Sequence, residues 1–118
     1  MEEWKPVGAD DMLRDGSMTE VRVNDTRVLI ARVQGSYYAV QGTCAHLRGK
    51  LADGKLDGFV LQCPRHGSQF DVRDGRVVAW ITKITGLARN IAETVKRPQP
   101  LHSYRTRMQD GRVWVEIA

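Results

Sequence analysis

Two short motifs in this chain combine the residue types that bind soft metal ions. Cys44 is followed two positions later by His46, and Cys63 is followed three positions later by His66. The chain has 2 cysteines and 3 histidines, so only His102 lies outside the two motifs. A cysteine thiolate is a soft ligand and a neutral imidazole is a borderline one. Two of each therefore suit zinc or an iron–sulfur cluster.

The spacing within the first motif helps to distinguish between these metals. Zinc sites on one loop usually separate their ligands by two residues or more, whereas only Ala45 lies between Cys44 and His46. In an extended loop, such neighbours point in different directions. This fits two metal atoms better than one tetrahedral centre. A two-iron cluster meets that need, because one iron can take both cysteines and the other both histidines.

The complete pattern resembles the Rieske [2Fe–2S] family. It reads Cys44-x-His46, then sixteen residues, then Cys63-x-x-His66. Further positions are also similar to the family, namely Leu51, Gly54, Pro64, Gly67 and Ser68. The resemblance implies one [2Fe–2S] cluster per chain, one-electron transfer and four ligands, namely Cys44, His46, Cys63 and His66.

Departures from the respiratory and photosynthetic members of that family refine the expectation. Those proteins carry two more cysteines, which form a disulfide, at positions that correspond here to Gly49 and Arg65. They also carry a tyrosine near the position that Phe70 occupies here, and the hydroxyl group of that tyrosine raises the potential of the cluster. Ser68, by contrast, is retained as a hydrogen-bond donor. Histidine ligation raises the potential of a Rieske cluster above that of an all-cysteine cluster. Without the disulfide and the tyrosine, we expect a potential of roughly −150 mV rather than roughly +300 mV.

These features predict a soluble Rieske ferredoxin that carries single electrons from a reductase to an oxygenase or another terminal oxidoreductase. We expect an electron carrier and not an enzyme. The mononuclear iron of a Rieske oxygenase needs further histidines, and only His102 remains. One alternative is a small Rieske subunit of a larger oxidoreductase, similar to the small subunits of nitrite reductase. A lower-ranked alternative is a structural zinc-binding interaction module.

The rest of the chain predicts strands that would position the two motifs. The segment 20–40 carries β-branched and aromatic residues around Asn24-Asp25 and Gln34-Gly35, which indicates three strands and two tight turns. Residues 59–62 indicate a strand that leads into Cys63. Asp74-Gly75 and Asp110-Gly111 each separate two β-rich runs, as hairpin turns do.

We therefore expect one domain over residues 1–118, an all-β antiparallel sandwich or barrel of the Rieske type. In the resemblance, residues 1–43 and 101–118 correspond to the basal β domain and about 42–72 to a small cluster-binding subdomain. An insertion at about 79–97 departs from similar ferredoxins. Apolar residues at helical spacing within it predict a helix at about 86–96, which ends before Pro98.

Charge and hydropathy limit the partners and the location. The net charge is +4, and residues 44–118 hold thirteen basic and seven acidic side chains. Arg48, Lys50, Lys55 and Arg65 lie within or beside the motifs, so we expect redox partners with an acidic docking surface. No Lys/Arg block suggests nucleic-acid binding, and no apolar run is long enough to span a membrane. The N-terminal residues lack the features of a secretion signal, so we expect a cytoplasmic protein without membrane attachment.

Overall fold

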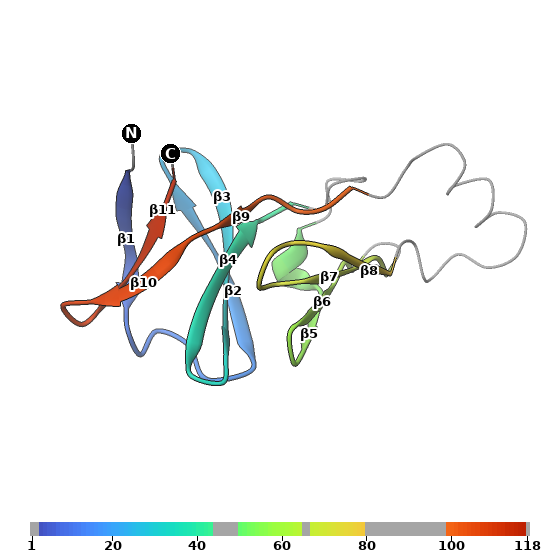
Figure 1. The fold of residues 1–118 in the computed structure, drawn as a ribbon, viewed down its shortest axis with the longest axis horizontal. Helices are drawn as coiled ribbons and strands as arrows, with labels where there is room; N and C mark the ends of the chain where they lie inside the picture. The colour runs from blue at the N-terminus through green and yellow to red at the C-terminus, as the bar shows by residue number, and fades with distance from the viewer. Residues whose placement is uncertain (1–2, 44–49, 65–66, 80–98, 118) are drawn as a thin grey trace, which may run out of the picture.

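The computed structural model describes residues 3–43, 50–64, 67–79 and 99–117. Within these segments the chain forms three antiparallel sheets (Figure 1). The terminal sheet has the order β1-β11-β10, the central sheet β2-β3-β4-β9 and the hairpin sheet β5-β6-β7-β8. This confirms the predicted all-β antiparallel architecture.

The strands are short, and one 3-10 helix accompanies them in the described segments. Their bounds are β1 Trp4–Ala9, β2 Ser17–Val23, β3 Thr26–Val33, β4 Ser36–Gln41, η1 Leu51–Asp53, β5 Lys55–Asp57, β6 Val60–Gln62, β7 Gln69–Asp71, β8 Val77–Ala79, β9 Ser103–Tyr104, β10 Thr106–Gln109 and β11 Arg112–Glu116. In Figure 1 the terminal sheet and the hairpin sheet lie on opposite sides of the central sheet.

Two-residue turns with positive φ angles join the strands of the predicted hairpins. Asn24 and Asp25 have φ angles of 49° and 67°, and they join β2 to β3. Gln34 and Gly35 join β3 to β4 with φ angles of 53° and 80°. Asparagine, aspartate and glycine tolerate this backbone region best, and such turns match the twist of a hairpin. Asp110-Gly111 repeats the arrangement between β10 and β11, so these predicted turns are confirmed.

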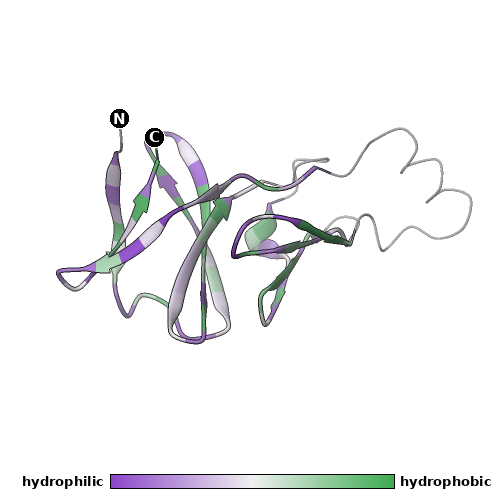
Figure 2. Cartoon of the chain, in the orientation of Figure 1, coloured by the Kyte–Doolittle hydropathy of each residue, from purple (hydrophilic) through white to green (hydrophobic). Residues whose placement is uncertain are grey.

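The strand β3, in the central sheet, is buried on both faces along its middle. Val28, Leu29, Ile30 and Ala31 are consecutive, and each is 0% exposed. Successive side chains of a strand point to opposite faces, and a strand buried on both faces is continuously apolar. Figure 2 shows this green run in β3 among strands of mixed hydropathy.

Each face of the central sheet belongs to a different hydrophobic core. Val28 and Ile30 pack with residues of the terminal sheet in the core formed by Val23, Val28, Ile30, Tyr37, Ala39, Val113 and Val115. Leu29 and Ala31 pack with residues of the hairpin sheet in the core formed by Leu29, Ala31, Val33, Val40, Leu51, Leu61, Cys63, Phe70, Val72 and Leu101. We call this second set the hairpin core. It joins the region of the two Cys/His motifs to the central sheet.

The hairpin between β7 and β8 turns at Asp74-Gly75, as predicted. Gly75 has a φ angle of +81°, and a Cβ atom placed on it would overlap the carbonyl of Leu101. The amide of Leu101 donates a hydrogen bond to the carbonyl of Gly75 at 2.8 Å. Glycine is therefore required here for both its conformation and its lack of a side chain.

The helix predicted at about 86–96 lies outside the described residues. Among the residues that are described, no helix is long and apolar enough to cross a membrane.

Candidate functional site

Of the four predicted ligands, the structure describes Cys63. Its side chain is 0% exposed and belongs to the hairpin core. Cys44, His46 and His66 lie outside the described residues. The geometry of the site therefore comes from the backbone on either side of these residues.

The first motif lies in a loop whose two ends are held together. Thr43 and Lys50 form an isolated antiparallel bridge. The amide of Leu51 donates to the carbonyl of Gly42 at 3.0 Å. We call these four residues, Gly42, Thr43, Lys50 and Leu51, the first neck. It fixes where the loop that contains Cys44 and His46 leaves the sheet and returns.

Gln41 ties the first neck to the C-terminal part of the chain. Its side-chain amide donates to the carbonyl of Thr43 at 2.8 Å, and its side-chain oxygen accepts from the amide of His102 at 2.7 Å. The ring of His102 lies 4.6 Å from that of Tyr104, in an edge-on arrangement. His102 was given no role from the sequence, and here its backbone supports the neck. The role of Gln41 had no signal in the sequence, because it depends on a contact across 61 positions.

The second motif begins at the end of β6 and turns back into β7. The amide of Cys63 donates to the carbonyl of Ser68 at 2.8 Å, and the amide of Gly67 donates to the carbonyl of Cys63 at 3.2 Å. Gly67 has a φ angle of 77°, a backbone conformation that glycine adopts readily. Ser68 is 0% exposed. These bonds close the second loop as the first neck closes the first.

The two loops start from neighbouring places in the fold. Leu51, which ends the first neck, and Cys63, which starts the second loop, belong to the same hairpin core. Between them, Gly54 lies so close to the carbonyl of Gln62 that no side chain fits at position 54. The chemistry of the donor set and the burial of Cys63 in the hairpin core both fit a cluster that is shielded from water on its cysteine side.

Phe70 lies directly behind the second loop. It is on β7 opposite Leu61, and its side chain is 0% exposed. Phenylalanine has no hydroxyl to donate. The position where a tyrosine is expected in high-potential relatives is therefore a purely apolar part of the core.

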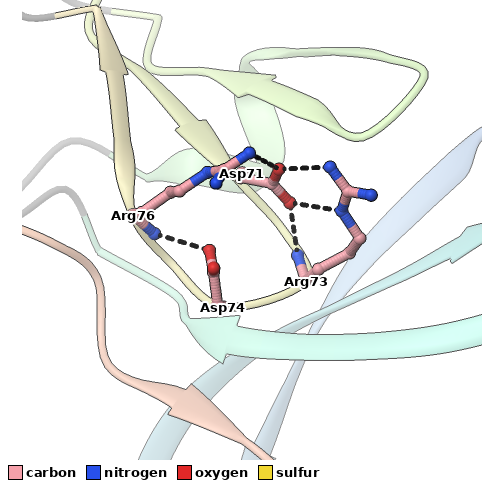
Figure 3. A network of polar contacts seen from close by, with 4 residues as sticks. All are labelled: Asp71, Arg73, Asp74 and Arg76. Carbon is pink, nitrogen blue, oxygen red and sulfur yellow. Dashed lines mark hydrogen bonds and ion pairs between the residues drawn. The ribbon is translucent and has the colours of Figure 1, made fainter.

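A network of charged groups orders the hairpin that follows the second loop (Figure 3). The side chain of Asp71 is 4% exposed and accepts two hydrogen bonds from the guanidinium of Arg73, at 3.0 and 2.7 Å. The backbone amide of Arg73 donates to the same carboxylate at 2.9 Å, and Arg76 approaches it at 3.3 Å. Asp74 accepts from the amide of Arg76 at 3.0 Å. The hydrogen bond from the Arg73 side chain, above all, lowers the pKa of Asp71.

Arg73 also connects this hairpin to the central sheet. Its guanidinium carbon lies 4.1 Å from the centroid of the Phe59 ring. The Phe59 ring in turn meets Tyr38 of β4 edge-on, with 5.8 Å between centroids. Nothing in the local sequence indicates this connection. The Asp-x-Arg spacing at 71–73 signals a local turn, but the contacts with residues 59 and 38 depend on the tertiary fold.

The basic residues expected to steer a partner are described only in part. Lys50 and Lys55 are exposed, on either side of η1, while Arg48 and Arg65 lie outside the described residues. The two tryptophans that are described make contacts in the terminal sheet. Trp4 lies under Arg107 at 4.0 Å, and the Trp114 indole donates to the Gln109 carbonyl at 3.0 Å.

Comparisons with known proteins identify the family of this chain. The family model for the Rieske [2Fe–2S] domain matches residues 3–89. Ferredoxin CarAc of Metapseudomonas resinovorans is 31% identical over 113 residues, which cover 95% of this chain and 92% of that protein. The ferredoxin component of the naphthalene 1,2-dioxygenase/salicylate 5-hydroxylase systems of a Ralstonia species is 30% identical, over 65% of this chain and 74% of that protein.

Solved structures show the same fold. One is a complex of reduced oxygenase and oxidized ferredoxin in carbazole 1,9a-dioxygenase; a chain of it matches with a TM-score of 0.76 and 28% identity, over 96% of this chain and 92% of that chain. A Mycobacterium tuberculosis protein assigned as an NADH-dependent nitrite reductase small subunit matches with a TM-score of 0.77 and 19% identity, over 100% and 97%. At that identity the likeness shows the fold alone. With a family model over residues 3–89 and relatives of this similarity, the chain belongs to the Rieske [2Fe–2S] domain family.

Proposed function

We propose that this chain is the ferredoxin component of a multicomponent oxygenase system and passes single electrons from a reductase to a terminal oxygenase. The observation that carries the proposal is the pair of closed loops, each with one Cys/His motif, that start from one hydrophobic core. The family membership and the ferredoxin relatives support it. The chain is an electron carrier; the oxidation of the substrate takes place in another component.

The cofactor of the family is a Rieske [2Fe–2S] cluster, which accepts and releases one electron when it is bound. Cys44 and Cys63 would hold one iron, and His46 and His66 the other. The backbone of the two closed loops would set the separation of these ligands. Burial of Cys63 would exclude water from the thiolate side, while histidines on the other side would face the partner.

The apolar surroundings of Phe70 support a potential at the lower end of the Rieske range, roughly −150 mV. No hydroxyl at position 70 is available to stabilise added negative charge on the site. A low potential suits a carrier that takes electrons from a reductase and delivers them to another Rieske centre.

The organisation and the location complete the proposal. Residues 1–118 would form one domain, with a cluster-binding subdomain at about 42–72 and an insertion at about 79–97. The hairpin core, which is shared by the central and hairpin sheets, supports a single domain. The protein would act in the cytoplasm, where reductases and oxygenases of this kind meet their electron donor.

A second candidate is the small subunit of a larger oxidoreductase such as nitrite reductase. The Mycobacterium tuberculosis protein shares the fold, but at 19% identity this likeness says nothing about a shared role. The identity to ferredoxin components is higher, at 30% and 31%. We therefore rank the ferredoxin first.

Anaerobic mixing of the reduced protein with a purified, oxidised Rieske oxygenase tests the carrier role. We expect the oxygenase cluster to become reduced, with one electron transferred from each chain of this protein. The rate of this transfer should be second order, that is, first order in each of the two proteins. A second experiment purifies the untagged chain from its own host. A stable stoichiometric complex with a larger oxidoreductase would favour the alternative, that the chain is a small subunit of that enzyme.

A further inference from the structure

Glu20 lies in the middle of β2 with its side chain directed at the first neck. It pairs with Leu29 across β2 and β3, so it projects from the face of the central sheet that bears the hairpin core. A Cβ atom built on Gly42 would lie 2.9 Å from the Oε1 atom of Glu20. The carboxyl group of Glu20 thus occupies the space that a side chain at position 42 would need.

The Oε1 atom of Glu20 is buried, and it has no hydrogen-bond partner among the residues that the structure describes. Most buried polar atoms in proteins are paired, and each exception calls for an explanation. An unpaired buried oxygen destabilises the fold, and an apolar side chain of similar shape would avoid this penalty.

Covalent geometry limits the distance from this group to the first ligand position. Gly42 precedes Cys44 by two residues, and two peptide units extend over about 7 Å. The Cα atom of Cys44 therefore lies within about 12 Å of the Oε1 atom of Glu20, whatever path the loop takes. This separation is short enough for one charge to influence another through the low-permittivity interior of a protein.

We propose that Glu20 sets the reduction potential of the cluster. Its carboxylate places a negative charge beside the first neck, and this charge opposes the arrival of the electron that the reductase donates. The inference rests on the proposed function and adds a residue outside the four ligands. In this proposal Glu20 acts through its charge and not as a ligand.

Replacement of Glu20 by glutamine tests the proposal, because it removes the charge and keeps the shape. The midpoint potential of the loaded protein is measured by redox titration followed by EPR. At an effective permittivity of about 20, one charge at such a separation changes the equilibrium of cluster reduction about five- to tenfold. We expect the midpoint of Glu20→Gln to rise by up to 59 mV, which corresponds to a tenfold change for one electron.

Asp110→Asn is the matched control. Asp110 is exposed in the β10–β11 turn, at the edge of the terminal sheet that lies away from the hairpin sheet (Figure 1). This change also removes one negative charge, and asparagine tolerates the positive φ angle of 56°. Its midpoint should equal that of the unmodified protein. Glu20→Asp keeps the charge. Its reduction equilibrium should therefore stay within a factor of about two of that of the unmodified protein.

A midpoint for Glu20→Gln that equals that of Asp110→Asn overturns the proposal. If the glutamine variant does not retain its cluster, Glu20→Met gives the same comparison with an apolar side chain. The failure of the proposed function looks different, since the unmodified protein would then show no Rieske signal at all. Spectra with unchanged g-values and a raised midpoint would identify an electrostatic effect rather than a change of ligands.

Discussion

The guanidinium carbon of Arg73 lies 4.1 Å from the centroid of the Phe59 ring, and the same guanidinium pairs at two points with Asp71. One side chain thus neutralises a buried carboxylate and covers an aromatic ring that contacts the central sheet. The hairpin after the second ligand loop is held in place by this double contact. The stability of the fold should therefore depend on Arg73 and Asp71.

Replacement of Arg73 by alanine should lower the free energy of unfolding by about 1–3 kcal/mol, because Asp71 is then left buried with weaker partners. Chemical denaturation of the apoprotein measures this difference. Arg107→Ala is the control, since Arg107 also covers an aromatic ring, that of Trp4 at 4.0 Å. Its loss should cost about 0.5–1 kcal/mol. Equal losses for the two variants would mean that the ion pair with Asp71 contributes nothing.

The stability contributed by Asp71 should depend on pH in a defined direction. The folded protein lowers the pKa of Asp71, mainly through the hydrogen bond from Arg73. The contribution is therefore complete above the pKa of the unfolded chain, about 3.9. It is lost as the pH falls through the lower value of the folded state. Denaturation of the unmodified protein and of Asp71→Asn at several pH values should give a difference that is constant near pH 7 and shrinks below about pH 4. A difference that grows in acid would contradict this account.

Gly75 should be much less tolerant of alanine than Gly111, although both have similar backbone angles. Their φ angles are +81° and +75°, so each substitution carries a strain of about 1–2 kcal/mol. A Cβ atom at Gly75 also overlaps the carbonyl of Leu101, whereas one at Gly111 meets open space. Thermal unfolding of the two variants should therefore show the larger loss for Gly75→Ala. Similar losses would show that the chain near Leu101 moves aside without cost.

Lys50 and Lys55 should accelerate association with the electron partner. Both are exposed, and they flank η1 close to the first neck. Lys50→Gln/Lys55→Gln should slow the second-order rate at low ionic strength about twofold to tenfold, since it removes attractive charge. The same change should flatten the dependence of the rate on salt. Arg112→Gln, in the terminal sheet, serves as the control and should leave the rate unchanged. A rate that is insensitive to salt in the unmodified protein would argue against an acidic partner surface.

The hairpins of the basal sheets could be predicted because their signals are local. Asn24-Asp25 and Gln34-Gly35 stand between β-rich runs, and three of these four residues are of types that tolerate the positive φ angles of such turns. The apolar run at Val28–Ala31 likewise indicates burial on both faces. In these segments the sequence pattern and the tertiary fold favour the same structure.

The parts that could not be predicted depend on contacts between distant positions. Gln41 supports the first neck by accepting a hydrogen bond from the amide of His102. The sequence around residue 41 gives no signal that predicts this bond. In the sequence, Arg73 cannot be distinguished from an ordinary surface arginine. Its contact with the Phe59 ring depends on the tertiary fold. Glu20 alternates with apolar residues along β2 as any solvent-facing residue would, yet one of its oxygens is buried. The helix at about 86–96 and the placement of Cys44, His46 and His66 stay predictions.

The central claim is that two Cys/His motifs on neighbouring loops hold one histidine-ligated [2Fe–2S] cluster. The most direct test is the EPR spectrum of the protein, purified anaerobically and reduced with dithionite, together with its iron and sulfide content. We expect a rhombic signal of low average g-value, with about two irons and two sulfides per chain. His46→Cys/His66→Cys should convert this signal to that of an all-cysteine cluster. A protein that binds stoichiometric zinc, and no iron or sulfide even after anaerobic reconstitution, would contradict the account.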